Sequence, residues 1–442
     1  MTNFVTLPVM CTLCGLAWVT RGRENARGRA IGLAWIIVAI FGAVNSGYWQ
    51  GAYLGAAAVM LIGMLHGERR ERIQTAVTPW TVLFWVYLTV SASVYAGTYS
   101  FRRPAVEVPV LIVIAASMAK CRAADLRMIW ISLLVSAYLE VVVGLRGIRS
   151  PVDVWGYTPG HNLLPGASHF YRVAGTLNHP IVYAVVMVIG LVIVVANPLT
   201  WSRLPRIVSG IMFFGGLYAS GSRSAFVAVA IGIIVYLLHA VRLTHWVRNL
   251  TFIAMLTFAV SVLFGHQIAL VKDKLLNSTS FTQRQSSLEG FGRLLHRTGT
   301  QQWFGVGFDG QGKLYAQHYL YSTNNTTTVD NMLVYSLGTM GLIGFALLIG
   351  YCGWMLYRAD RLGRALLCGF YAMFFSFDVL TWPSMVFLMT LLMGAGVMSR
   401  QIGKLASAPE GGDDGEPSEK TDYAEPAVPT NAVPNSSYIP AT

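Results

Sequence analysis

The chain has 442 residues, of which 54% are hydrophobic and only 12% are charged, and it carries a formal net charge of +12. Soluble domains carry about 25% charged residues, so this composition excludes an ordinary soluble globular protein. Apolar runs recur along the whole chain, which also excludes a single signal peptide followed by a soluble domain. The sequence therefore predicts an all-α polytopic membrane protein.

Apolar runs along the chain predict about 12–13 transmembrane helices, since a span needs roughly 20 mostly apolar residues. The first run either crosses the membrane or lies along its surface, which leaves the side of the N-terminus open. We expect residues 1–404 to form one transmembrane domain. The candidate spans lie near residues 4–20, 29–45, 50–65, 79–97, 105–119, 128–145, 181–196, 206–219, 225–240, 250–270, 331–356, 365–379 and 383–399.

The distribution of basic residues predicts the orientation, because short cytoplasmic loops collect Lys and Arg. Alternate connections hold 20 of the 32 basic residues, which places the C-terminus in the cytoplasm. Two long segments, 146–180 and 271–330, then face outward and hold most of the remaining positive charge. Residues 405–442 contain seven of the 20 acidic residues and six prolines, so we expect a disordered acidic cytoplasmic tail.

The first outward segment ends in Arg172, Gly175, Asn178, His179 and Pro180. Proline is favoured in the first turn of a helix, and glycine and asparagine are typical of the chain reversal before it. The pattern predicts that Arg172 lies just above a helix entrance.

Residues 220–225 join two spans with almost no loop between them. Ser222 is a suitable N-cap for the following helix, which puts Arg223 beside unpaired backbone N–H groups. A cation is unfavourable at the positive end of a helix dipole unless an anion lies between them, so we expect an anion site. The alternative is an arginine that reaches lipid headgroups at the interface.

In the second outward segment, the spacing of the apolar residues predicts a helix over residues 281–297, with Arg284 and Arg293 on or near its polar face. A glycine-rich stretch follows at 305–310 and suits a close approach of two backbones. The segment ends in Asp330 and Asn331, directly before an apolar run. Asp330 is a candidate for chemistry, and the alternative is that it only caps the next helix.

Three further acidic residues lie within or at the edge of spans, where a charge is costly and is a candidate for function. We expect Glu107 and Asp378 to lie at the membrane interface and Glu140 to face an outward cavity. The histidines show no metal-ligand spacing, so no metal site is expected.

Four short signatures in this order resemble the O-antigen ligase and O-antigen polymerase (polysaccharide polymerase) superfamily. The resemblance covers roughly residues 170–345. The signatures are Arg172-x-x-Gly175-Thr176-x-Asn178-x-Pro180, Ser222-Arg223-Ser-Ala225, Arg284 followed by Gly305-Val-Gly307, and Asp330-Asn331-x-Leu333 before Gly341-Leu-Ile-Gly344.

The resemblance implies a metal-independent, multi-span glycosyltransferase without a cofactor. Such an enzyme moves a glycan from an undecaprenyl diphosphate carrier to an acceptor glycan on the outer face of a bacterial cytoplasmic membrane, and binds membrane lipids but no nucleic acid. Arginines can hold a diphosphate by bidentate contacts, and a carboxylate can take the acceptor proton. The expected catalytic residues are Asp330, Arg284 and Arg223, and the expected substrate-binding residues are Arg172, Asn178, His179, Arg293, Asn331 and Glu140.

Two departures from the family pattern bear on the reaction. Ligases of the family commonly carry His at the position of Asp330, and the acidic residue often found before the Gly-Leu-x-Gly turn is Thr339 here. Both favour a repeat-unit polymerase, with an O-antigen ligase acting on a lipid, wall-polymer or protein acceptor as the alternative. A flippase or exporter of lipid-linked oligosaccharide is a hypothesis of another class, but it needs charges at the bilayer midplane. A non-catalytic membrane anchor would not need the outward arginines.

Overall fold

The computed structural model describes residues 14, 25–43, 48–65, 79–95, 98–149, 154–162, 164, 167, 169–239, 279–321 and 329–407. Within these residues the chain is α-helical, with no strand and one isolated β-bridge between His161 and Tyr171. The predicted all-α fold is thereby confirmed for the described part of the chain. Residues 405–407 complete the last helix, and the expected disorder of the remaining tail lies outside the described residues.

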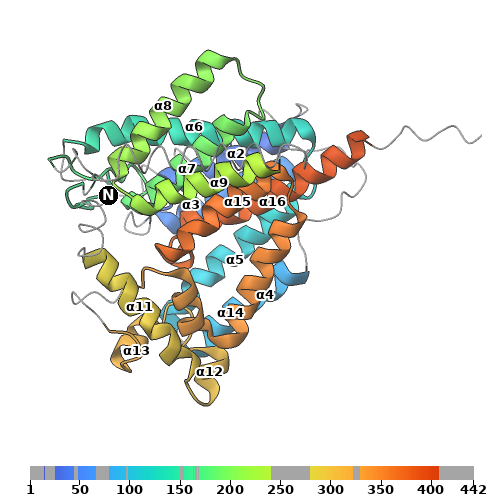
Figure 1. Cartoon of the computed structure of the whole chain (residues 1–442). Coiled ribbons are helices and arrows are strands. Elements are labelled where there is room, and N and C mark those ends of the chain that lie inside the picture. The colour runs from blue at the N-terminus through green and yellow to red at the C-terminus, as the bar shows by residue number, and fades with distance from the viewer. Residues whose placement is uncertain are drawn as a thin grey trace, which may run out of the picture.

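The helices follow in chain order and are labelled in Figure 1. They are α2 (Ala26–Phe41), α3 (Trp49–Leu65), α4 (Pro79–Tyr95), α5 (Thr98–Met118), α6 (Ala123–Gly147), α7 (Pro180–Ala196), α8 (Arg203–Ser220), α9 (Arg223–Leu238), α11 (Thr279–Leu295), α12 (Thr300–Phe304), α13 (Gln311–Ala316), α14 (Met332–Arg358), α15 (Arg361–Ala372) and α16 (Pro383–Ser407), with 3₁₀ turns η3 (Met373–Phe375) and η4 (Val379–Thr381) before α16.

Most predicted spans coincide with helices, and two differ. The predicted spans 4–20 and 250–270 lie outside the described residues, apart from a helical Cys14. Helix α5 begins at Thr98, well before the expected start at 105. The span predicted over 365–379 is wrong, because α15 ends at Ala372. The chain must then reach Pro383, which opens α16, and the residue before a proline is pushed into extended backbone.

Length and composition separate the described helices into two groups. Three are long and apolar enough to cross a membrane: α6, α14 and residues Pro383–Ile402 of α16. Shorter apolar helices cover Trp49–Leu65, Thr81–Ser93, Pro180–Ala196 and Arg223–Leu238. The total of 12–13 spans stays a prediction.

Helix α7 packs against α6, α8, α9 and α15, which lie around it in Figure 1. Every residue from Pro180 to Val194 is buried, which agrees with its almost continuous run of Val and Ile. A helix that is apolar on all sides is stable only when it is enclosed. The residues just before Pro180 are therefore held by the best-packed element of the fold.

Helix α14 is broken at Gly341, which has a left-handed φ of 66°. The break leaves carbonyl groups without helical partners, and other segments supply the hydrogen bonds. The Arg297 guanidinium donates from Nη1 to Gly338 O at 3.0 Å and from Nη2 to Leu337 O at 2.6 Å. The backbone N–H of Gly307 donates to Thr339 O at 2.9 Å. The second outward segment is thus anchored on the break.

Glycine is required where the two backbones meet. A Cβ atom on Gly305 would lie 2.3 Å from Thr339 O, and one on Gly341 would lie 2.4 Å from the Trp303 carbonyl carbon. These distances are far below van der Waals contact, so no larger residue fits without moving a backbone. The close approach predicted from the glycine-rich stretch is confirmed, and it fixes residues 305–310 against α14.

The orientation of the second outward segment can be tested by labelling. After the native cysteines are replaced, Cys introduced at Glu289, an exposed position of α11, is expected to react with an impermeant thiol reagent in intact cells. Tyr357, exposed at the end of α14, lies on the predicted cytoplasmic side and provides the matched control. Labelling of Tyr357→Cys in intact cells, with labelling of Glu289→Cys only in opened cells, would reverse the orientation.

Candidate functional site

The turn between α8 and α9 brings two arginines together. Arg172 lies along the C-terminal end of α8, since its Nε donates to Ser220 O at 2.9 Å and the neighbouring Val173 N donates to Ala219 O at 3.0 Å. Arg223 is the first residue of α9, as predicted. Ser222 occupies the N-cap position, but its side chain makes no capping hydrogen bond. The site therefore combines two cations with the positive end of a helix.

The chain reverses its direction just before α7. Gly175 and Asn178 have left-handed φ values of 60° and 61°, and Pro180 is the first helical residue, so the predicted turn is confirmed. His179 is the N-cap, and its Nδ1 accepts a hydrogen bond from Ile181 N at 3.3 Å. The amide of Asn178 is buried, and neither of its polar atoms has a hydrogen-bond partner among the residues that the structure describes.

Glu140 supports this turn from inside the protein. Its side chain is only 2% exposed, and its carboxylate accepts hydrogen bonds from Thr176 N at 2.9 Å and from the Thr176 hydroxyl. The expectation that Glu140 faces an outward cavity is therefore wrong, because α6 holds it under the turn. Its use in substrate binding stays a prediction.

His179 connects the turn to the segment between α15 and α16. Its ring lies 5.9 Å from the Tyr157 ring and 5.0 Å from the Trp382 ring, measured between centroids. Burial, helped by the charge of Arg172, lowers the pKa of His179 to about 3. His179 is thus neutral at physiological pH and does not add to the positive charge of Arg172.

Asp378 lies in the segment that joins α15 to α16, and sequence reasoning did not include it in the site. It is 7% exposed and Glu107 is 1% exposed, so both side chains are buried in the protein. The expected position of both at the membrane interface stays a prediction. The turn is closed by the Thr381 hydroxyl, which donates to Asp378 O at 2.9 Å. Burial, helped by the charge of Asp330, raises the pKa of Asp378 to about 8, so its carboxyl group is protonated at neutral pH.

Asp330 lies at the entrance of α14, where it is half-buried. The cap of this helix is Asn331, whose Oδ1 accepts from Leu333 N at 2.9 Å and from Val334 N at 3.2 Å. The alternative that Asp330 is only a cap is thus wrong. The charges of Asp330 and Asp378 both act on Tyr315, whose pKa is raised to about 12, mainly by burial. These three groups form one acidic cluster.

The arginines of α11 have different surroundings. Arg293 donates from Nε to Tyr319 O at 3.0 Å and lies over the Tyr321 ring at 4.5 Å, so it holds residues 319–321 of the second outward segment. Arg284 belongs to the first half of α11, but its side chain lies outside the described residues. The predicted roles of both in binding the substrate stay predictions.

The predicted site residues therefore fall into two groups. Arg172, Arg223 and His179 lie around the entrances of α7 and α9, and Trp382 links His179 to the acidic cluster of Asp330 and Asp378. Glu140, Asn331 and Arg293 are engaged in holding helix ends and turns. Among the described residues, no group of three or more His, Cys, Asp or Glu side chains is arranged to hold a metal ion. The expectation of no metal stays a prediction.

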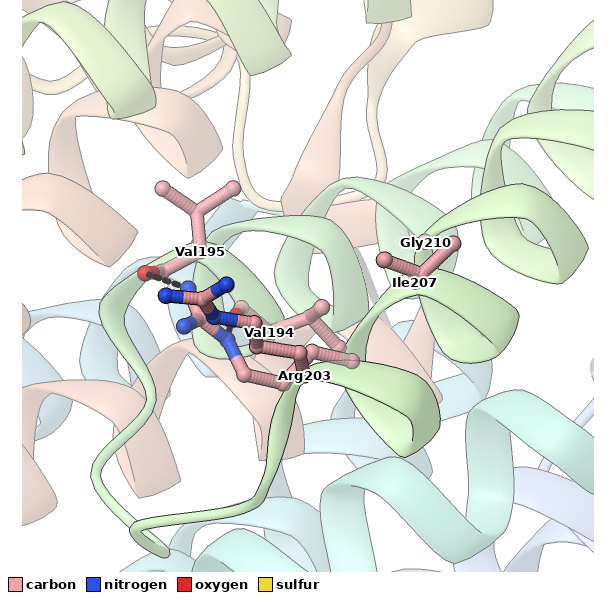
Figure 2. Close-up of a pocket in the computed structure, with 6 residues that line it drawn as sticks. Val194, Val195, Arg203, Ile207 and Gly210 are labelled. Atoms are coloured by element: carbon pink, nitrogen blue, oxygen red, sulfur yellow. Dashed lines mark hydrogen bonds between the residues drawn. The ribbon is translucent and has the colours of Figure 1, made fainter.

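A cavity of about 350 Å³ lies away from this constellation, between the end of α7 and the start of α8. Figure 2 shows Arg203 and its apolar neighbours around it, and Arg206 donates to Val194 O and Val195 O at 3.2 Å. His179 caps the opposite end of α7, and 17 helical residues span about 25 Å. This cavity is not part of the candidate site.

Part of the chain is similar to a known protein family. Residues 207–349 match the family model for O-antigen ligase. The matched range includes Arg223, Arg284, Asp330 and the break in α14, and it begins after Arg172 and His179. A search of curated proteins finds no match. The resemblance predicted from the sequence motifs is confirmed over the matched range.

Proposed function

Because residues 207–349 match the family model for O-antigen ligase, we propose that this membrane protein is a glycosyltransferase acting on lipid-linked glycans. It moves a glycan from an undecaprenyl diphosphate carrier to an acceptor hydroxyl. The reaction takes place on the outer face of the bacterial cytoplasmic membrane, toward which the two outward segments are expected to face. No metal ion takes part, because arginines supply the positive charge.

The reaction is a substitution at the anomeric carbon of the first sugar on the carrier. The oxygen of the acceptor hydroxyl forms a bond to this carbon, and the bond from the carbon to the diphosphate oxygen breaks. The electron pair of the broken bond goes to the diphosphate, which leaves as undecaprenyl diphosphate. The hydroxyl proton goes to a carboxylate of the protein, which acts as general base.

The observation that carries the proposal is the placement of two arginines at the α8–α9 turn, which a contact between two rings links to the segment of Asp378. Arg172 and Arg223 lie at the α8–α9 turn, next to the positive end of α9. Guanidinium groups bind phosphate oxygens through two donors and stabilise charge that develops on a leaving group. The contact between His179 and Trp382 joins this turn to the segment that carries Asp378.

The two carboxyl groups have different protonation states, which suits them to different tasks. Asp378 is protonated at neutral pH, since its pKa is about 8. Two neighbouring carboxyl groups cannot both ionise easily, so a proton on one favours the charged form of the other. Asp330 is therefore the proposed base, and neutral Asp378 is a hydrogen-bond donor beside it.

The departures from the family pattern favour a repeat-unit polymerase, in which the acceptor is a second lipid-linked glycan. The test is incubation of the purified protein with undecaprenyl diphosphate-linked oligosaccharide in the presence of a chelator. Chain extension with this substrate alone supports a polymerase. Transfer only to an added lipid, wall-polymer or protein acceptor supports a ligase, and loss of transfer in the chelator contradicts metal independence.

The pH dependence of turnover tests the assignment of the two carboxyl groups. Below pH 8 Asp378 keeps its proton, and above pH 8 it ionises next to Asp330. Asp378 then has no proton to donate in a hydrogen bond, and its negative charge repels that of Asp330. Turnover is therefore expected to fall above about pH 8. Asp378→Asn carries a donor that does not ionise, so it should be active and lack this alkaline limb. An inactive, correctly folded Asp378→Asn would assign the base role to Asp378 instead.

A further inference from the structure

Arg103 lies on α5, outside the matched range, and touches three separate segments. Its Nε donates to Glu107 Oε1 at 2.7 Å, one helical turn along α5, and its Nη2 donates to Leu380 O. Its guanidinium carbon lies 5.6 Å from the centre of the Phe308 ring. One side chain thus joins α5 to residues 305–310 and to the segment between α15 and α16.

This ion pair is enclosed by the protein. The side chain of Arg103 is 13% exposed and that of Glu107 is 1% exposed. Removing two charges from water is costly, and a hydrophobic pair of similar volume is often as stable or more stable. Charged residues within membrane helices are rare and are candidates for function for the same reason. Stability alone therefore does not account for Arg103.

The contacts of Arg103 lie close in sequence to two acidic residues, Asp378 of the site and Asp309 of the second outward segment. Leu380, whose carbonyl accepts from Arg103, is two residues after Asp378. Phe308 directly precedes Asp309, whose backbone N–H donates to the Tyr335 hydroxyl at 3.2 Å. The second outward segment and the α15–α16 connection come from distant parts of the sequence, and Arg103 contacts both.

We propose that Arg103 is a positioning residue, which holds the turn of Asp378 at the entrance of α14 beside Asp330. The inference rests on the proposed glycan transfer, in which Asp330 and Asp378 work as a pair. Arg103 acts in two ways. Its planar guanidinium group holds the turn through the hydrogen bond to Leu380 O. Its positive charge favours the ionised form of Asp378.

The charge effect has a definite sign. The groups that act on Asp378 are Asp330, Thr381 and Arg103, with Tyr315 and Tyr335 within electrostatic range of it. Asp330 raises the pKa of Asp378, whereas Arg103 lowers it. Removal of the Arg103 charge therefore raises this pKa, and the alkaline limb of turnover moves to higher pH.

Three variants separate positioning from a purely structural role. Arg103→Gln removes the positive charge and the planar guanidinium group, and it leaves Glu107 without its ion-pair partner. Arg103→Gln combined with Glu107→Gln removes both buried charges, which restores a neutral interior. Arg103→Lys keeps the charge and loses the planar guanidinium group. Turnover, its pH dependence and hydrogen exchange of residues 376–382 are measured for each purified protein, with donor binding as a reference.

We expect Arg103→Gln and the double variant to lose about 10²-fold in turnover, because small displacements of catalytic groups cost about this much. The pH above which their turnover falls should be higher than in the wild type, because the charge of Arg103 lowers the pKa of Asp378. Arg103→Lys should have lower turnover, but its turnover should fall above nearly the same pH as that of the wild type. Hydrogen exchange of residues 376–382 should increase in all three.

A double variant that regains both wild-type turnover and the wild-type alkaline limb would overturn the proposal, since Arg103 would then only neutralise Glu107. Unchanged hydrogen exchange of residues 376–382 would also overturn it, whatever the turnover. Failure of the proposed function gives a different result, because the wild-type protein itself would then transfer no glycan while the exchange measurement still tests the position of the turn.

Discussion

Asp330→Asn is expected to lower turnover by about 10²–10⁴ and to leave donor binding nearly unchanged, because loss of a general base has this effect on the chemical step. The substitution keeps the size of the side chain and removes its ability to accept the proton. Since Asn331 provides the cap of α14, a weakened cap does not explain such a loss. The measurement is product formation and carrier-lipid binding on the same purified variant.

Asp360→Asn provides the matched control. Asp360 caps α15, its Oδ1 accepting from Gly363 N at 2.7 Å, and it lies at the cytoplasmic end of the fold by the predicted orientation. Asparagine caps helices as well as aspartate does, so this variant should keep the cap and show normal turnover. Asp330→His should be partly active, because ligases of the family carry His there. A fully active Asp330→Asn would remove Asp330 from the mechanism and direct attention to His179.

Arg223→Lys should lower both donor binding and turnover, the latter by about 10²-fold, as is typical for loss of a group that stabilises charge in the transition state. Lysine keeps the positive charge but lacks the planar pair of donors that matches a phosphate. The residue begins α9, so the change leaves the helix interior intact. Binding of undecaprenyl diphosphate and glycan transfer should be measured together.

Arg206→Lys is the corresponding control, because Arg206 also lies at a helix end and is held by backbone carbonyls of α7. It is at the far end of α7 from His179, so binding and turnover should both stay at the wild-type level. Equal losses in Arg206→Lys and Arg223→Lys would mean that the binding assay reports general damage. Normal donor binding by Arg223→Lys alone would contradict its contact with the diphosphate.

The sequence allowed most helices to be predicted, because a helix in lipid must be continuously apolar and this pattern is local. Helix α7 is the clearest example, with Pro180 at its start and an apolar run to its end. The end of α15 was missed, because Phe374, Phe375 and Phe377 continue the apolar pattern although the helix ends at Ala372. The early start of α5 was missed because Arg102 and Arg103 looked like the end of a loop.

The entrances of α7 and α9 were predicted well, since glycine, proline and serine have strong positional preferences at helix ends. The carboxyl groups were harder to assign. Nothing in the local pattern distinguishes Asp330 from Asn331 as a cap, because both residue types favour that position. Asp378 was assigned to the interface since its neighbours in the chain are aromatic and apolar. Only the packing of the α15–α16 connection against distant segments brings it to Asp330.

The break in α14 could also not be predicted from a local sequence pattern. Gly338, Gly341 and Gly344 are tolerated in a membrane helix, so the sequence predicts an unbroken span. The break is stabilised by Arg297 and by the N–H of Gly307, which come from the preceding outward segment. One sequence signal was available for the buried ion pair, namely Arg103 and Glu107 at i and i+4 on one helix face.

The central claim is that the protein breaks the bond between the glycan and the diphosphate, and that Asp330 takes the proton of the acceptor hydroxyl. It is tested most directly by counting both products of one reaction, the transferred glycan and the released undecaprenyl diphosphate, by mass spectrometry. The wild-type protein should release one carrier diphosphate for each glycan transferred, and Asp330→Asn should bind the donor and release almost none. A glycan that keeps phosphate after transfer, or a lipid-linked glycan that crosses the membrane unchanged, would contradict the account.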